Sequence, residues 1–210
     1  MARGRFITLE GGEGAGKSTQ IKRLAAKLEA QGIAVVVTRE PGGAPGAEAI
    51  RELLVQGEPG RWTPRTEALL HFAAREEHLA RTIRPVLGRG DWVISDRFVD
   101  STMAYQGVAQ GLGAEFIGKL QALVVGKDMP VLTLVLDIAP EAGLARASGR
   151  ATPGEDRYER MNLEFHQTLR QAFLNIAKKD PKRCSVIDAS QDEDTVAAAI
   201  WAIVQARLLA

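Results

Sequence analysis

The residues best suited to chemistry form a glycine-rich stretch near the N-terminus. Residues 11–18 read Gly-Gly-Glu-Gly-Ala-Gly-Lys-Ser and match every fixed position of the phosphate-binding P-loop. The glycines let backbone amides turn inward around phosphate groups, at the positive end of a helix. Lys17 is expected to reach the β- and γ-phosphates, and the Ser18 hydroxyl to bind Mg²⁺. The stretch predicts a nucleoside triphosphate site formed by Gly11, Glu13, Gly14, Ala15, Gly16, Lys17, Ser18 and Thr19.

Asp96 and Arg97 place opposite charges side by side at the end of an apolar run. A carboxylate at a strand tip beside the P-loop suits the Mg²⁺ side of the site. The planar fork of Arg97 can bind two oxygens of an acceptor phosphate at once. Phosphoryl transfer needs such cations to hold two anionic partners in line. The alternative is a local Asp–Arg ion pair with no ligand.

Five apolar runs predict the strands that must position these groups. They lie at residues 5–10, 33–38, 92–96, 131–137 and 184–188. Helical patterns fill the intervals, at about 17–31, 46–56, 65–88, 113–125, 140–148, 158–179 and 192–209. The alternation predicts an α/β fold with a parallel sheet covered by helices on both faces. No linker divides the chain, so we expect one domain over residues 1–210, with its ligands at the carboxyl ends of the strands.

Composition limits the classes of partner. The 210 residues carry a formal net charge of +1, so no global field attracts nucleic acid or an anionic membrane. The one cysteine, Cys184, leaves no internal disulfide and is expected to be a small buried hydrophobe. The sequence shows no signal peptide and no run long enough to cross a bilayer. We therefore expect a cytoplasmic protein with no nucleic-acid or membrane partner.

Three motifs in combination resemble the thymidylate kinase family. They read Gly-x-Glu-Gly-x-Gly-Lys at 11–17, Thr-Arg-Glu-Pro-Gly-Gly at 38–43 and Asp-Arg-Phe-x-x-Ser-x-x-Ala-Tyr-Gln at 96–106. The resemblance covers nearly the whole chain, with the motifs in the family's order. It implies the P-loop nucleoside monophosphate kinase fold, with a five-stranded parallel sheet and a short lid. It also implies transfer of the γ-phosphate of ATP to dTMP, giving dTDP, with Mg²⁺ as cofactor and usually in a homodimer.

The resemblance also implies roles at the phosphate and sugar of the acceptor. Glu13 resembles the carboxylate that contacts the sugar 3′-hydroxyl, since a carboxylate among phosphate-binding amides would otherwise repel the ligand. Arg97 is expected to hold the acceptor phosphate, with Arg39 as a weaker candidate. That phosphate is already an ionised nucleophile near neutral pH, so no general base is required. Asp96 is then a metal-side or arginine-orienting carboxylate, and Lys17 and Arg97 are expected to act on the transferring group.

The base and sugar of the acceptor are expected to meet a second set of residues. Phe72 resembles the aromatic that stacks on the thymine ring, and Arg75 the residue that bonds the pyrimidine edge. The alternative for Phe72 is simple core packing. Gln106 carries both a donor and an acceptor, so it can recognise a pyrimidine edge. Tyr105 resembles the residue that crowds the sugar C2′, and Ser101 is expected near the base.

The expected lid covers residues 148–157. In one group of these kinases an arginine follows the P-loop carboxylate; in the other a glycine stands there and the lid supplies the cation. Gly14 indicates the second group. Arg150 is the first choice for the catalytic lid cation that reaches the phosphoryl group, and Arg146 the second. Arg157 is expected to orient the closed lid or to contact ATP.

Two other functions stay open on the sequence. One is a kinase for a different nucleoside monophosphate, which a panel of acceptors would separate. The other is a non-catalytic, nucleotide-dependent switch or assembly protein. That reading leaves the residues of the predicted base and sugar site without a common purpose.

Overall fold

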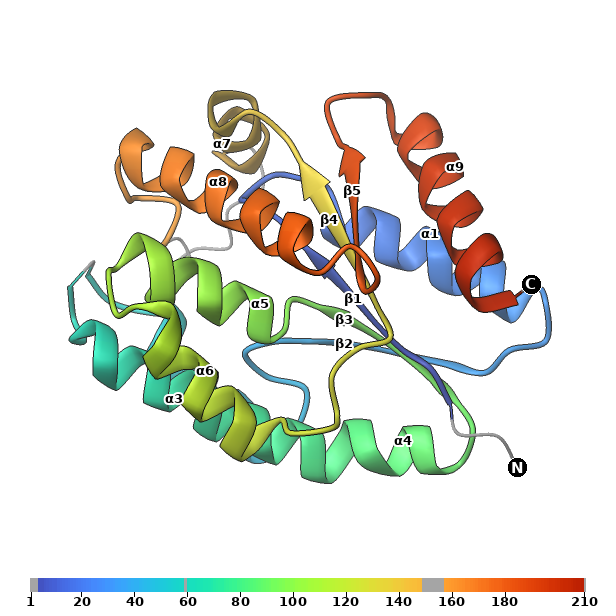
Figure 1. The fold of residues 1–210 in the computed structure, drawn as a ribbon, viewed down its shortest axis with the longest axis horizontal. Helices are drawn as coiled ribbons and strands as arrows, with labels where there is room; N and C mark the ends of the chain where they lie inside the picture. Colours follow the sequence, from blue (N-terminus) through green and yellow to red (C-terminus); the bar gives the residue numbers. More distant parts are fainter. Residues whose placement is uncertain (1–3, 59, 149–156, 210) are drawn as a thin grey trace.

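The apolar runs form one parallel sheet (Figure 1). A computed structural model describes residues 4–58, 60–148 and 157–209. The five strands lie in the order β2-β3-β1-β4-β5, which confirms the predicted fold class. Their bounds are β1 (Phe6–Glu10), β2 (Val35–Arg39), β3 (Trp92–Asp96), β4 (Leu132–Asp137) and β5 (Cys184–Asp188). Each predicted strand is therefore confirmed to within two residues at either end.

Helices connect the strands and cover both faces of the sheet (Figure 1). Among the described residues they are α1 (Lys17–Glu29), α2 (Pro45–Val55), α3 (Pro64–His78), α4 (Arg84–Gly88), α5 (Val99–Thr102), α6 (Ala114–Val124), α7 (Pro140–Ser148), α8 (Leu163–Lys179) and α9 (Glu193–Val204). Wider π-helical turns follow three of them, at η1 (Leu79–Ile83), η2 (Met103–Ala109) and η3 (Gln205–Leu209). No helix in the described parts of the chain is both long enough and apolar enough to span a membrane.

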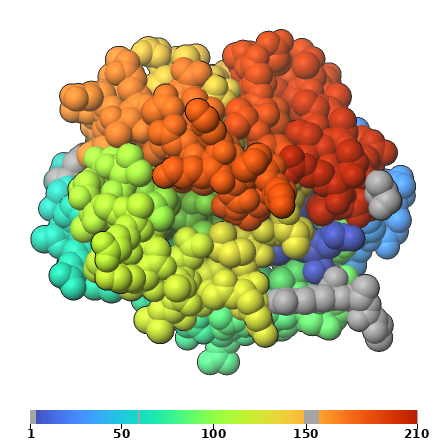
Figure 2. Space-filling view, in the orientation of Figure 1, coloured from blue at the N-terminus to red at the C-terminus, as the bar shows by residue number. Residues whose placement is uncertain are grey.

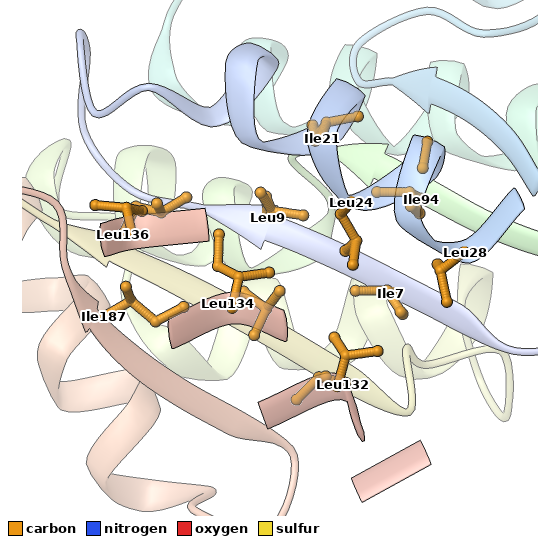
Figure 3. Packing of buried hydrophobic residues seen from close by; sticks show 14 of the residues in the cluster. Ile7, Leu9, Ile21, Leu24, Leu28, Ile94, Leu132, Leu134, Leu136 and Ile187 are labelled. Carbon is orange, nitrogen blue, oxygen red and sulfur yellow. The ribbon is translucent and has the colours of Figure 1, made fainter. Parts of the chain in front are cut away.

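Side chains alternate along β1, so one strand supplies two cores. Ile7 and Leu9 point towards α1 and pack in the same cluster as Ile21, Leu24 and Leu28 (Figure 3). Those three residues lie on one face of α1 because their spacing follows the helical period. Burying each such side chain contributes about 2 kcal/mol. This packing anchors the strand and the helix on either side of the P-loop.

The opposite face of the sheet supports the rest of the site. Phe6 and Val93 pack there with side chains of α3, η1, α4 and α6. Val135 and Cys184 pack with α8 and η2, and burial raises the pKa of Cys184 to about 12. The expectation that Cys184 is a small buried hydrophobe is confirmed. Side chains of α8, in orange, and α9, in red, fill much of the upper surface in Figure 2.

Some helix boundaries differ from the predicted ones. Helix α8 begins at Leu163 rather than near residue 158, because the Asn162 side chain caps it by accepting the Phe165 amide at 2.9 Å. The predicted helix over 65–88 is divided into α3, η1 and α4, where Arg84 donates its amide to Leu79. The helical turns of α5 and η2 were not among the predicted helices.

The register of the sheet brings the predicted motifs to one edge. Asp96 lies opposite Leu9 on β1 and opposite Arg39 on β2. The three strands therefore end at the same level. The P-loop, Asp96 with its neighbour Arg97, and the loop at 39–46 all leave the sheet together.

Candidate functional site

The P-loop joins β1 to α1 in the conformation that its glycines predict. Gly14 and Gly16 have φ values of 66° and 86°, in the left-handed region. A Cβ on Gly14 would lie 1.9 Å from the carbonyl oxygen of Gly143 in α7, so the loop and α7 pack backbone to backbone. Gly16 caps α1 without a side-chain hydrogen bond. The first amides of α1 are thus left for a bound anion.

Lys17, Ser18 and Asp96 lie together at this helix end. Lys17 Nζ donates to the carbonyl oxygens of Gly11 at 3.2 Å and Gly12 at 2.9 Å. Ser18 Oγ donates to Asp96 Oδ2 at 3.0 Å. A hydroxyl and a carboxylate so close together offer the hard oxygen ligands that Mg²⁺ prefers.

Arg97 is held against the P-loop by an unusual backbone. Its φ is 69°, a value that a non-glycine residue rarely adopts. The Glu10 side chain supports this turn by accepting the Phe98 amide at 2.8 Å. The guanidinium then donates to Gly11 O at 2.9 Å and to Glu13 Oε1 at 3.0 Å. The turn therefore aims the predicted phosphate-binding cation across the P-loop.

Glu13, Arg97 and Tyr105 form one polar cluster. The Tyr105 hydroxyl donates to Glu13 Oε1 at 2.5 Å, and the Arg97 guanidinium carbon lies 5.1 Å from the Tyr105 ring centroid. Burial alone would raise the pKa of Glu13, but Arg97 and Lys17 lower it to about 2. Glu13 is therefore ionised at neutral pH.

Two pockets meet at this cluster. The first is lined by Glu13, Glu40, Pro41, Arg51, Val55, His71, Arg75, Arg97, Phe98, Ser101, Thr102, Tyr105, Gln106, Tyr158 and Glu159. The second follows the P-loop and is lined by residues 13–18 together with Arg39, Glu40, Arg51, Asp96, Arg97, Ala147 and Glu159. Glu13 and Arg97 belong to both walls. Two ligands, one in each pocket, would therefore meet between these side chains.

The far end of the first pocket carries one donor and one acceptor. Arg75 is 1% exposed and donates from Nε to Glu40 at 2.8 Å and from Nη2 to Thr102 at 3.0 Å. Gln106 donates from Nε2 to Glu67 at 2.7 Å. Among the described residues, Arg75 Nη1 and Gln106 Oε1 have no partner although both are buried. A ligand here must offer an acceptor and a donor of its own.

Phe72 does not lie where the predicted stacking requires. It is 2% exposed within the apolar core and is not part of the pocket wall. His71 lines the pocket instead, one helical turn before Arg75. Burial lowers the pKa of His71 to about 4, so the ring is neutral at pH 7. The helical spacing from Arg75 could have indicated His71, because residues four apart share a helix face.

Comparison with known proteins identifies the family of the chain. The family model described as "Thymidylate kinase" matches residues 9–200. A thymidylate kinase of Caulobacter vibrioides is 55% identical over 208 residues, covering 99% of each chain. The crystal structure of the thymidylate kinase of Ehrlichia chaffeensis aligns with a TM-score of 0.79 at 34% identity, covering 97% of this chain and all of that one. The chain belongs to the thymidylate kinase family.

The three arginines expected to serve the lid have different surroundings. Arg150 lies outside the described residues. Arg146 donates to the carbonyl oxygen of Ala189 at 2.9 Å and lines a third pocket, not the wall that the first two pockets share. Arg157 is 3% exposed, binds Glu67 and donates to Leu54 O at 2.9 Å. The expectation that Arg157 contacts ATP is not supported, because its charge is used between α2 and α3.

Ser101 and Arg39, which the resemblance places near the acceptor, have different surroundings. Ser101 lines the first pocket, accepts from Arg97 at 3.2 Å and donates to Glu10 at 2.6 Å. Arg39 is half exposed, pairs with Glu48 at 3.1 Å and lines the P-loop pocket but not the first pocket. Arg39 therefore lies beside the P-loop, and its expected contact with the acceptor phosphate stays a prediction.

The third pocket was not foreseen from the sequence. It adjoins the P-loop and is lined by residues 14–16 together with Thr19, Gln20, Arg146, Ala189, Gln191, Asp192, Glu193 and Val196. No short motif marks it, because its walls come from the P-loop, α1, α7, the loop after β5 and α9. Its place beyond the P-loop suits the nucleoside of a bound triphosphate.

Proposed function

We propose that the two meeting pockets carry out the reaction of this family, the phosphorylation of dTMP to dTDP with ATP. ATP occupies the P-loop pocket and dTMP the first pocket. The observation that carries the proposal is that Glu13 and Arg97 belong to both walls, so the two anions meet at a shared cation. Holding two anions in line and neutralising their charge is what phosphoryl transfer requires.

The donor side uses the residues of the P-loop. Its amides and Lys17 hold the phosphates of ATP. Ser18 and Asp96, whose oxygens lie 3.0 Å apart, would hold Mg²⁺, which would supply positive charge to the phosphate oxygens. Asp96 serves the metal rather than accepting a proton.

The acceptor side reads phosphate, sugar and base in turn. Arg97 holds the phosphate of dTMP, and Glu13 accepts from the sugar 3′-hydroxyl beside Tyr105. Gln106 Oε1 accepts from N3–H of thymine, and Arg75 Nη1 donates to a ring carbonyl. Both atoms are buried without a hydrogen-bond partner among the described residues, and the thymine edge offers the complementary donor and acceptor.

The lid and the assembly belong to the same proposal. Gly14 has no room for a side chain against Gly143, which supports the group of kinases whose lid supplies the cation, here Arg150. A homodimer is supported by exposed apolar side chains on α3 and α6, Leu69 at 47% and Leu123 at 81%. We place the enzyme in the cytoplasm.

A panel of acceptors tests the function. Purified protein with ATP and Mg²⁺ is given dTMP, dUMP, dCMP, AMP or GMP, and ADP release and product are measured. We expect dTDP from dTMP, with AMP and GMP nearly inert. Failure to form dTDP would overturn the proposal, and equal rates with all acceptors would restrict it to a general monophosphate kinase.

A further inference from the structure

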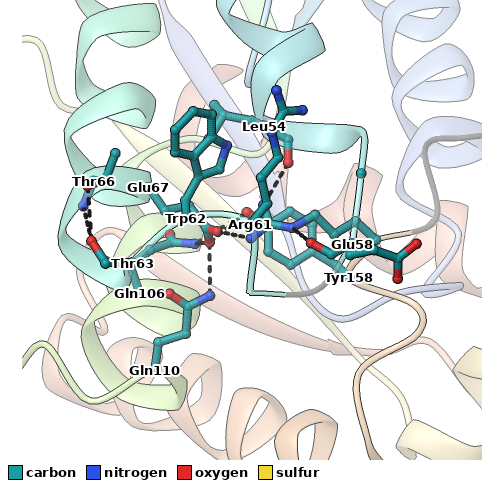
Figure 4. Close-up of polar contacts among 12 residues, drawn as sticks. Leu54, Glu58, Arg61, Trp62, Thr63, Thr66, Glu67, Gln106, Gln110 and Tyr158 are labelled. Carbon is teal, nitrogen blue, oxygen red and sulfur yellow. Dashed lines mark hydrogen bonds and ion pairs between the residues drawn. The ribbon is translucent and has the colours of Figure 1, made fainter.

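Glu67 is a buried carboxylate to which the proposed function gives no role. It lies on α3 and is fully buried. It accepts hydrogen bonds from Gln106 Nε2 at 2.7 Å, Gln110 Nε2 at 2.9 Å and the Tyr158 hydroxyl at 2.9 Å, and it pairs with Arg157 (Figure 4). Four groups from two distant segments thus converge on one side chain.

The charge state of Glu67 decides what these partners must present. Burial alone would raise the pKa of Glu67, but His71, Arg157 and the hydrogen bond from Gln110 hold it below its usual value. An ionised carboxylate only accepts hydrogen bonds. Each amide that touches Glu67 must therefore turn its nitrogen towards it.

This requirement orients Gln106. With Nε2 bound to Glu67, the amide oxygen must point the other way, and that oxygen is buried without a partner in a residue that lines the acceptor pocket. Arg75 presents its unpartnered donor Nη1 in the same wall. The base site thus presents one acceptor, Gln106 Oε1, beside one donor, Arg75 Nη1. Glu67, which binds the other end of the Gln106 amide, determines that the oxygen faces the pocket.

The same carboxylate holds the chain that follows the lid. Arg157 and Tyr158 both bind Glu67, and Tyr158 also lines the acceptor pocket. The C-terminal end of the predicted lid is therefore attached at the base site. A change at Glu67 would therefore alter the contacts of Arg157 and Tyr158 as well as those of Gln106.

We propose that Glu67 is a positioning residue for base specificity. By accepting only, it keeps the oxygen of Gln106 facing N3 of the base, where thymine has a donor and cytosine an acceptor. The inference rests on the proposed function, because the phosphate at Arg97 and the sugar at Glu13 fix the place of the ring. If Glu67 were replaced by a group that can also donate, the side-chain amide of Gln106 could flip and present its nitrogen, instead of its oxygen, to the base.

The test compares dTMP with dCMP in the full chain. Glu67→Gln keeps the size but can donate or accept, so we expect kcat/KM for dTMP to fall and the preference for dTMP over dCMP to fall at least about tenfold. Glu67→Asp stays an acceptor only, and should keep the preference even if overall activity drops. Gln110→Ala is the matched control, because it removes a hydrogen bond to the same carboxylate oxygen outside the pocket, and should leave the preference unchanged.

A double-mutant cycle separates positioning from a merely structural role. If Glu67 acts through Gln106, the loss of preference in Glu67→Gln and Gln106→Ala should not add in the double variant. Equal losses for dTMP and dCMP in Glu67→Gln, or full additivity, would overturn the inference. Lack of dTMP preference in the unmodified protein would instead count against the proposed function. Thermal unfolding of each variant identifies any that fails to fold. If Glu67→Gln fails to fold, the preference of Glu67→Asp for dTMP over dCMP is the deciding measurement, and its loss would overturn the inference.

Discussion

At the scale of single residues, Arg97 connects the two halves of the site. Its guanidinium binds the P-loop carbonyl of Gly11 and the carboxylate of Glu13, and it lies on the wall of both pockets. Burial alone would lower the pKa of Arg97. The neighbouring charge of Glu13 outweighs this effect and raises the pKa above its usual value, so Arg97 stays charged. A fixed cation between two anions suits transition-state stabilisation better than substrate binding alone.

Arg97→Ala should therefore lose turnover while ATP binding survives. We expect kcat to fall by at least about a hundredfold, as for other lost charge-stabilising donors, with ATP affinity within a few fold of the original. Arg39→Ala is the control, because Arg39 is a half-exposed arginine that lines the P-loop pocket but not the first pocket. Steady-state kinetics and calorimetric titration with ATP measure both. Loss of ATP binding with turnover retained at saturation would contradict the assignment.

At the scale of elements, the P-loop depends on α7. Gly14 and Gly143 approach so closely that a Cβ on either would clash with a backbone oxygen of the other segment, at 1.9 Å and 2.4 Å. An arginine at position 14, as in the other group of these kinases, would have to displace α7. We therefore expect no gain of activity from Gly14→Arg.

Gly14→Ala tests this packing. The left-handed φ and the overlap with Gly143 should together cost about 3 kcal/mol of unfolding free energy and weaken ATP binding. Gly12→Ala is the matched control in the same loop, because a Cβ there meets no atom within 4 Å. Urea unfolding and ATP titration compare the two variants. Equal stability of both would show that α7 moves aside freely.

At the scale of the whole molecule, one buried carboxylate links stability to pH. Burial raises the pKa of Glu10 to about 8, well above the usual 4.5. The folded state then keeps a proton that the unfolded chain has released, so stability falls as pH rises from about 4.5 to 8. His71, with its pKa lowered to about 4, has the opposite effect, but only below its unfolded value of 6.5. Glu10 should therefore dominate between pH 6.5 and 8.

We expect the unfolding free energy to fall by about 2 kcal/mol between pH 6.5 and 8. Glu10→Gln cannot release a proton and should flatten this part of the profile. Urea unfolding at several pH values in that interval measures the slope for each protein. A slope that persists unchanged in Glu10→Gln would place its origin in another group.

The sequence by itself determined the parts of the protein that local spacing encodes. Lys17, Ser18 and the three P-loop glycines with positive φ, at 11, 14 and 16, predict a strand, a loop and a helix, because the local backbone conformation depends largely on neighbours in the chain. Asp96 and Arg97 could be placed beside the P-loop for a related reason, since parallel strands carry their carboxyl ends to one edge. Fold class and donor site followed from these rules.

The tertiary structure alone decided which side chains line the first pocket. His71 and Phe72 are adjacent on α3, and only the rotation of that helix against the sheet sends one to the pocket and the other to the core. Glu67 and Arg157 stand 90 residues apart, and no spacing marks them as partners. Their pairing depends on where α2, α3 and the residues before α8 come to lie. Helix rotation and long-range pairing are properties of packing, which the order of residues determines only through the completed fold.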